Sequence, residues 1–220
     1  MDAFHERLAR VALRASSALG FALAGGYAVQ AHGFLTRPSE DVDLFTSAER
    51  TDFRDGVTAI KSAYEKNGIE VRVDVCGDHF ARLWVTDTHS GQSGKVELAA
   101  DIRSQAPVTM SIGPVVHVDD VAGGKMGALF TRAEARDFID IDAIVVSGRF
   151  TRGRLQELAA SKDAGFDLRV LADMLAVIDI YPDTEFSTYG LRGDQIQQMR
   201  ERFGAWRAEL LREPGPTSRS

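Results

Sequence analysis

Cysteine is nearly absent from this 220-residue sequence, which contains only Cys76. An internal disulfide is therefore excluded, and a reducing compartment such as the cytoplasm is expected. Long apolar runs are missing too, since none approaches the roughly 18 residues that a membrane-spanning helix needs. Charged residues interrupt the first nineteen positions. We therefore expect neither a signal peptide nor a contact with a membrane.

Positive charge is not in excess, because 26 Lys and Arg residues stand against 32 Asp and Glu residues, for a formal net charge of −6. This balance argues against a broad nucleic-acid-coating surface but allows a local basic patch. The candidates for such a patch are Arg132, Arg136, Arg149, Arg152 and Arg154. The five histidines show no metal-ligand spacing, so a zinc site is not expected.

The order of apolar patterns predicts a mixed α/β half followed by an all-helical half. Strands are predicted over 21–24, 41–46, 69–76, 80–86, 95–103 and 115–118. Helices are predicted over 3–19, 27–32, 48–66, 121–131, 136–147, 151–162, 168–180 and 194–211. We therefore expect an α/β core over residues 1–118, a helical domain over 119–212 and a disordered tail over 213–220. The seam between such halves is a common place for a ligand cleft.

Within the strand predicted over 69–76, alternation places Ile69, Val71, Val73 and Val75 on the inward face.

The chemistry is concentrated in residues 25–45, which read GGYAVQAHGFLTRPSEDVDLF. Asp41 and Asp43 fall on one face of a predicted strand, where two like charges repel each other unless a cation lies between them. A divalent metal such as Mg²⁺ is the most economical explanation. Gly25 and Gly26 lack Cβ atoms, so their backbone can approach a phosphate closely. A phosphate cradle beside metal-binding carboxylates is what transfer from a nucleoside triphosphate (NTP) requires.

A third carboxylate would complete a two-metal site. Asp101 is the first candidate, because it lies on a predicted neighbouring strand, and Glu97 on the same face is the alternative. In either case the third carboxylate would help to bind the metal that activates the attacking hydroxyl.

A second motif reads KMGALFTRAEARDFIDI and begins at Lys125. Lys125 stands near a helix start, where it can neutralise triphosphate charge, and Arg132 and Arg136 can extend a basic rim toward the substrate. Asp140 can orient Lys125 or the attacking hydroxyl. Asp137 and Asp140 can equally be first-turn helix acids that the helix dipole favours.

Both motifs together resemble the nucleotidyltransferase signature of the polymerase-β-like superfamily, and more narrowly the AbiEii/MenT type of toxin. Arg37, Ser39, Asp41 and Asp43 match its Arg-x-Ser-x-Asp-x-Asp pattern one for one. Gly26 departs from it, because the superfamily more often has serine there, which leaves only a backbone contact to phosphate. The family carries a lysine and a downstream aspartate in the second motif, matching Lys125 with Asp137 or Asp140.

This resemblance implies an α+β protein: a polymerase-β-like core with a mixed sheet flanked by helices, followed by a C-terminal helical bundle. It implies a toxin with a cognate antitoxin protein, which adds nucleotides from an NTP to RNA, typically the 3′ end of tRNA, and so blocks translation. Asp41, Asp43 and Asp101 would hold Mg²⁺, with Lys125 and Asp140 as further catalytic residues. The substrate-binding residues would be Gly25, Gly26, Arg37, Ser39, Arg132, Arg136 and Asp137.

The resemblance also suggests that an antitoxin can silence the protein by phosphorylating Ser39 or a neighbour, because a phosphate there would add negative charge beside two carboxylates. Two other functions stay open at this level. The same fold can modify a protein or a small molecule, or it can act as a non-catalytic binding module.

Overall fold

The computed structural model describes residues 1–50 and 52–212. Within these residues the chain divides into two compact units, the first covering Met1–Val121 and the second beginning at Ala122. The sequence pattern places this boundary after residue 118. The tail predicted over 213–220 lies outside the described residues.

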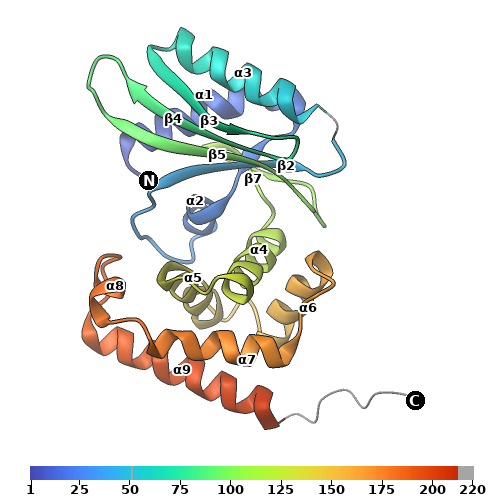
Figure 1. The fold of residues 1–220 in the computed structure, drawn as a ribbon, viewed down its shortest axis with the longest axis vertical. Coiled ribbons are helices and arrows are strands. Elements are labelled where there is room, and N and C mark those ends of the chain that lie inside the picture. Colours follow the sequence, from blue (N-terminus) through green and yellow to red (C-terminus); the bar gives the residue numbers. More distant parts are fainter. Residues whose placement is uncertain (51, 213–220) are drawn as a thin grey trace. The chain divides into compact units, whose positions relative to one another are not determined.

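The first unit combines a sheet with helices of the N-terminal part of the chain (Figure 1). Its helices are α1 (Ala3–Ala15), α2 (Gly25–Ala31) and α3 (Phe53–Lys66), with a 3₁₀ turn, η1, at Ser17–Leu19. Its strands are β1 (Ala22–Leu23), β2 (Asp41–Ser47), β3 (Ile69–Cys76), β4 (Phe80–Asp87), β5 (Ser93–Asp101), β6 (Val108–Met110) and β7 (Gly113–Val115). The helix predicted over 48–66 begins only at Phe53, because the chain first turns at Arg50, whose N–H donates to the carbonyl of Ser47.

The sheet is mixed, with strand order β3-β4-β5-β2-β1-β7-β6. β2 pairs with β5 in parallel and β1 pairs with β7 in parallel, whereas the remaining neighbours are antiparallel. β2 and β5 are therefore adjacent central strands, although about 45 residues of sequence separate them.

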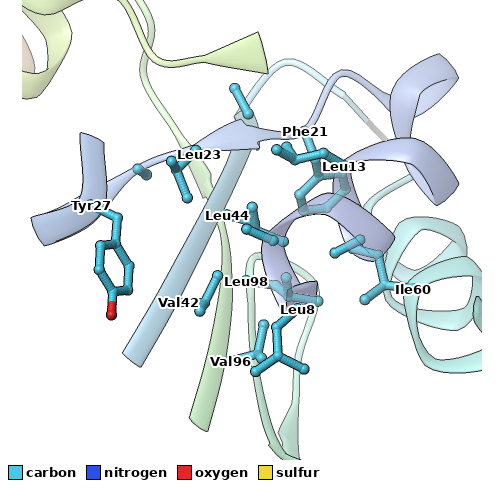
Figure 2. Close-up of a cluster of buried hydrophobic side chains, with 14 of the residues drawn as sticks. Leu8, Leu13, Phe21, Leu23, Tyr27, Val42, Leu44, Ile60, Val96 and Leu98 are labelled. Carbon is cyan, nitrogen blue, oxygen red and sulfur yellow. The ribbon is translucent and has the colours of Figure 1, made fainter. Parts of the chain in front are cut away.

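The larger part of the core of the first unit lies on one face of this sheet, where α1 and α3 pack together (Figure 1). Leu8 and Ile60 from these helices meet Leu44 and Leu98 from the central strands (Figure 2). Because strand residues alternate between faces, burying Val42 and Leu44 toward the helices turns Asp41 and Asp43 to the opposite face. The hydrophobic pattern of β2 thus determines where its carboxylates point.

The predicted inward face of β3 is wrong at its C-terminal end. Ile69 is buried, but Val73 and Val75 are 40% and 44% exposed. Val73 is opposite the buried Leu83 and therefore stays on the inward face, but β3 is an edge strand, which leaves Val73 exposed there. A shift in the pairing with β4 between Val73 and Val75 then sets Val75 opposite Arg82. A bulge of this kind moves the following residues to the other face, which alternation along the sequence alone does not reveal.

The second unit is helical throughout its described residues. The chain enters it through α4 (Val118–Thr131) and continues through α5 (Ala135–Val146), α6 (Arg152–Lys162), α7 (Leu168–Ala176), a 3₁₀ turn η2 (Val177–Asp179), α8 (Asp183–Ser187) and α9 (Gly193–Arg212). α7 packs along α9, and Phe138 of α5 meets Phe203 of α9 edge to face with ring centroids 5.1 Å apart. This unit therefore has a core of its own.

Candidate active site

Three carboxylates gather on the face of the sheet opposite α1 and α3. Asp43 of β2 is directly opposite Glu97 of β5, and Asp41 precedes Asp43 by two residues on the same face. One oxygen from each of Asp41, Asp43 and Glu97 lies within 4.8 Å of the others. Parallel pairing of β2 with β5 creates this group, because residues opposite each other in neighbouring strands point the same way.

Two cations stabilise the carboxylate cluster of Asp41, Asp43 and Glu97 in this structure. Lys95 Nζ lies 3.0 Å from Asp41 Oδ2 and 3.3 Å from Glu97 Oε1, and Arg82 Nε donates to Glu97 Oε1 over 2.8 Å. Burial alone lowers the pKa of Lys95, but its hydrogen bonds to Asp41 and Glu97 and their charges raise this pKa above its usual value. The cluster is therefore a place where positive charge is strongly favoured.

The donor set suits Mg²⁺, which prefers carboxylate oxygens. Octahedral bonds of about 2.1 Å place adjacent ligands about 3 Å apart, so small side-chain rotations would close the carboxylate cluster around an ion. Lys95 and Arg82 lie beside these oxygens, which shows that the carboxylate cluster attracts positive charge. This also supports a metal ion as its ligand.

Asp101, which the sequence pattern favours as the third carboxylate, does not lie in this cluster, whereas the alternative, Glu97, does. Asp101 lies opposite Ser47, four residues beyond Glu97 along β5. At about 3.3 Å per residue its backbone is roughly 13 Å from that of Glu97. The alternation correctly assigned both acids to one face. The register with β2, which selects Glu97, was not readable from either strand alone.

Position 25 requires glycine, because its backbone lies directly against the side chain of Asp43. Its φ of +56° is in the left-handed region, and a Cβ built on it would lie 1.7 Å from Asp43 Oδ2. At Gly26 a Cβ would lie 2.9 Å from Ser39 Oγ and 3.2 Å from an Arg37 guanidinium nitrogen. The two glycines therefore allow the start of α2 to lie directly against the residues of the first motif.

Arg37 and Ser39 lie beside the carboxylate cluster. Arg37 is buried, and its guanidinium donates to the carbonyl of Pro38 over 2.9 Å. Ser39 Oγ lies 3.5 Å from Asp41 Oδ1. A phosphoryl group on this hydroxyl would therefore stand directly against the carboxylate of Asp41.

Tyr27 of α2 also belongs to this region, although no motif in the sequence marks it. Its hydroxyl donates to Asp2 over 3.1 Å and lies 2.5 Å from His5 Nδ1, and burial together with Asp2 raises its pKa. A weaker contact of 3.4 Å reaches the carbonyl of Ser39. Tyr27 therefore ties the N-terminus of the chain to the loop before Asp41.

In the second unit, Lys125 and Asp140 form an ion pair. Lys125 Nζ on α4 lies 2.7 Å from Asp140 Oδ2 on α5, with the carboxylate fully buried and the lysine side chain 11% exposed. Both residues belong to the second sequence motif, in which Asp140 is a candidate to orient Lys125. A lysine held at this depth by a buried carboxylate has a fixed position, unlike an ordinary surface lysine.

Asp137 is placed at the N-terminus of α5. Its buried carboxylate accepts from Arg132 at both oxygens over 2.9 Å, and one oxygen also accepts from the Glu134 N–H in a capping box. Arg136 pairs with Glu134 at 2.8 Å. These contacts give Asp137 a structural role in capping α5.

Other arginines of the candidate basic patch also have acidic neighbours. Arg152 pairs with Glu209 at 2.6 Å and Arg154 with Glu157 at 3.1 Å.

Over the described ranges of the chain, no helix is both long enough and apolar enough to cross a bilayer.

Comparison with known proteins identifies one family across nearly the whole chain. A family model described as "Nucleotidyl transferase AbiEii toxin, Type IV TA system" matches residues 7–216. No curated protein matches the chain. Among solved structures, MenT4, a nucleotidyltransferase toxin from Mycobacterium tuberculosis H37Rv, is similar, with 17% identity, a TM-score of 0.59 and coverage of 96% of this chain and 84% of that one. JHP933 from Helicobacter pylori is also similar, with 20% identity, a TM-score of 0.52 and coverage of 96% and 97%. At these identities the two structures show a shared fold.

Proposed function

The chain belongs to the AbiEii family of nucleotidyltransferase toxins, and from this premise we propose that it uses Mg²⁺ to add nucleotides from an NTP to RNA, at the 3′ end of tRNA, and so blocks translation. Membership makes it a nucleotidyltransferase and the toxin of a toxin–antitoxin system, with an antitoxin as partner. Its site of action in this proposal is the cytoplasm, where NTPs and tRNA are present.

The observation that supports metal dependence is the cluster of Asp41, Asp43 and Glu97 beside the Gly25 turn. Bound there, Mg²⁺ would neutralise triphosphate charge and polarise the attacked phosphorus. We assign the third ligand to Glu97 in place of Asp101, because Glu97 is opposite Asp43. Fixed carboxylates of this kind need no reorganisation during the reaction.

The residues around the turn supply the donor-nucleotide side of this proposal. Gly25 lies directly against Asp43, and Arg37 and Ser39 lie against Gly26. We propose that they bind the phosphates of the NTP, with the Arg37 guanidinium stabilising charge on the departing pyrophosphate.

Lys125 and Asp140 complete the proposal. We assign to Lys125 the neutralisation of negative charge on the triphosphate, and to Asp140 the positioning of that lysine through their 2.7 Å ion pair. Arg132 and Arg136 remain candidates for RNA contact, whereas Asp137 is assigned to the capping of α5.

Incubation of the protein with labelled NTPs, Mg²⁺ and total RNA tests this function. Label in tRNA that disappears in Asp41→Asn, with the fold retained by circular dichroism, supports the proposal. Label found only in protein or in a small molecule would show that the acceptor is not RNA, although the reaction is still nucleotidyl transfer. Absence of label from every fraction would contradict nucleotidyl transfer under these conditions.

A further inference from the structure

An arginine-flanked aromatic surface adjoins the carboxylate cluster. Phe80, Arg82 and Trp84 alternate along β4 and therefore share the face of the sheet that bears Asp41 and Asp43, and Arg72 of β3 is opposite Trp84. The Arg72 guanidinium carbon is 6.0 Å from the centre of the Trp84 ring, and that of Arg82 is 5.6 Å from the centre of the Phe80 ring. We call these four residues the aromatic platform.

Trp84 is the unusual member of the aromatic platform. Of the two tryptophans in the chain, Trp206 is 2% exposed, whereas Trp84 is 42% exposed. Its neighbours Leu83 and Val85 supply the buried contacts of β4 on the opposite face, toward the core. Core packing therefore does not account for a tryptophan here. An exposed aromatic ring with a guanidinium group beside it, as Arg72 is beside Trp84, is a good surface for a nucleobase.

The strand register joins the aromatic platform to the proposed metal ligands. Trp84 is opposite Lys95, which is opposite Asp41, and in the next row Arg82 is opposite Glu97, which is opposite Asp43. Neighbouring strands are about 4.8 Å apart, so two strand spacings put the backbone of Trp84 roughly 10 Å from that of Asp41. A chain of nucleotides bound on the aromatic platform would thus reach the carboxylates with its end.

The strand order indicates which substrate this surface takes. Gly25 follows β1, and β1 borders β2 on the side away from β5. The aromatic platform lies on the other side, on β3 and β4. In phosphoryl transfer the attacking and leaving oxygens are roughly in line across the phosphorus. If the triphosphate binds at Gly25, the acceptor hydroxyl approaches from the β5 and β4 side.

Charge is available on that side when the carboxylates bind a metal. Lys95 and Arg82 now serve as counter-ions for Asp41 and Glu97. Once these carboxylates coordinate a divalent cation, both side chains can turn toward phosphate oxygens of a nucleic acid. Arg72 is largely exposed, with Asp74 3.5 Å away. The acceptor side thus combines stacking surfaces with cations, as single-stranded nucleic-acid sites do.

We propose that the aromatic platform binds the unpaired 3′-terminal nucleotides of the RNA acceptor, with a base stacked on Trp84 and the guanidinium groups of Arg72 and Arg82 contacting the backbone phosphates. This inference rests on the proposed function, because it concerns the acceptor of the same transfer. It assigns acceptor recognition to β3 and β4 of the first unit.

The test is equilibrium binding of a labelled, unstructured RNA of about ten nucleotides at fixed salt, followed by anisotropy and by protein fluorescence. Trp84→Thr keeps a strand-forming residue and should weaken binding roughly tenfold. Trp84→Tyr retains an aromatic ring and should restore most of the affinity. Ile102→Ala, at another exposed apolar residue of the first unit, should leave it unchanged. Circular dichroism and Mn²⁺ binding check that each variant keeps its fold and its carboxylate cluster.

Fluorescence gives a second, independent readout. With tryptophan excited selectively, RNA should quench the emission of the wild-type protein, and the quench should vanish in Trp84→Tyr, where the buried Trp206 is the remaining tryptophan. Equal RNA affinity of wild type and Trp84→Thr would overturn the inference alone. A full quench by NTP without RNA would also overturn it, because the ring would then serve the donor. Failure of the wild-type protein to bind RNA would overturn the proposed RNA function together with it.

Discussion

Gly25 is the residue of the candidate active site with the least room for a larger side chain. Replacing it with alanine adds a Cβ 1.7 Å from the Asp43 carboxylate oxygen at a φ of +56°. We expect Gly25→Ala to displace Asp43 and to weaken Mn²⁺ binding, measured by electron paramagnetic resonance, by at least tenfold. Unfolding in urea should show a loss of stability beyond the roughly 1–2 kcal/mol that a left-handed alanine costs.

Gly91→Ala is the matched control for this prediction. Gly91 has a φ of +73°, but no heavy atom lies within 4 Å of a Cβ built on it. Gly91→Ala should therefore lose only the stability that alanine costs in the left-handed conformation, and it should bind Mn²⁺ normally. Normal Mn²⁺ binding by Gly25→Ala would show that Asp43 can move aside without consequence.

The residues of the carboxylate cluster show what the sequence could predict. Asp41 and Asp43 were found because alternation along one strand is a local property. The sequence favours Asp101 over Glu97 and does not mark Lys95, because the positions of Glu97 and Lys95 beside Asp43 and Asp41 depend on how β5 pairs with β2. Lys95 precedes Glu97 by two residues and shares its face, which was the available signal. The register itself is a long-range property that neither strand specifies by itself.

At the scale of elements, the ion pair of Lys125 and Asp140 links α4 to α5. Lys125→Met leaves the buried Asp140 carboxylate without its lysine, and we expect it to lower the free energy of unfolding by about 3 kcal/mol. Adding Asp140→Asn removes that charge and should recover most of the loss. Chemical denaturation of the single and double variants measures both effects.

Activity separates the structural from the catalytic role of this pair. Nucleotidyl transfer should stay lost in the stable double variant, because the positive charge on Lys125 is still missing. A double variant that regains both stability and transfer would show that the pair only supports the fold.

The turn between β4 and β5 should give the protein a pH-dependent element. The backbone N–H groups of Ser90 and His89 donate to Asp87, and Arg7 of α1 pairs with it, so its pKa lies below the usual value near 3.9. A carboxylate with a depressed pKa stabilises the fold above its unfolded pKa and loses that effect as pH falls. The melting temperature of wild type should therefore exceed that of Asp87→Asn at pH 7, and the difference should shrink below about pH 4.

Asp78→Asn provides the comparison, because Asp78 pairs with Arg54 on the surface, where an ion pair contributes little. Its melting temperature should follow wild type at every pH. A difference between Asp87→Asn and wild type that is constant from pH 7 to pH 3 would contradict the assigned role of the Asp87 charge.

Element boundaries were less predictable than element types. The helical second half follows the 3.6-residue pattern of its apolar residues, and its predicted helices coincide closely with α4 to α7 and α9. In β3 the alternation between faces fails after Val73, because a bulge shifts the register there. An edge strand also has a neighbour on one side only, so fewer apolar contacts hold its residues on one face. Short strands such as β6, with three residues, carry too little pattern to be recognised.

At the scale of the whole molecule, each unit has its own core, while the carboxylate cluster belongs to the first unit alone. A divalent cation that binds the folded cluster should stabilise this unit by mass action, by about 2.7 kcal/mol at a concentration of 100 times its dissociation constant. In scanning calorimetry we expect excess Mg²⁺ over EDTA to raise the unfolding temperature of the wild-type protein.

Variants of the three acids make this shift diagnostic. Asp41→Asn and Glu97→Gln remove members of the carboxylate cluster and should abolish the Mg²⁺-dependent shift, whereas Asp101→Asn, opposite Ser47, should retain it. Each substitution removes one negative charge, so a general effect of net charge would reduce the shift equally in all three. Loss of the shift in Asp101→Asn with its retention in Glu97→Gln would return the third metal ligand to Asp101. The reverse pattern would mean that the parallel pairing of β2 with β5 determines which acid binds the metal.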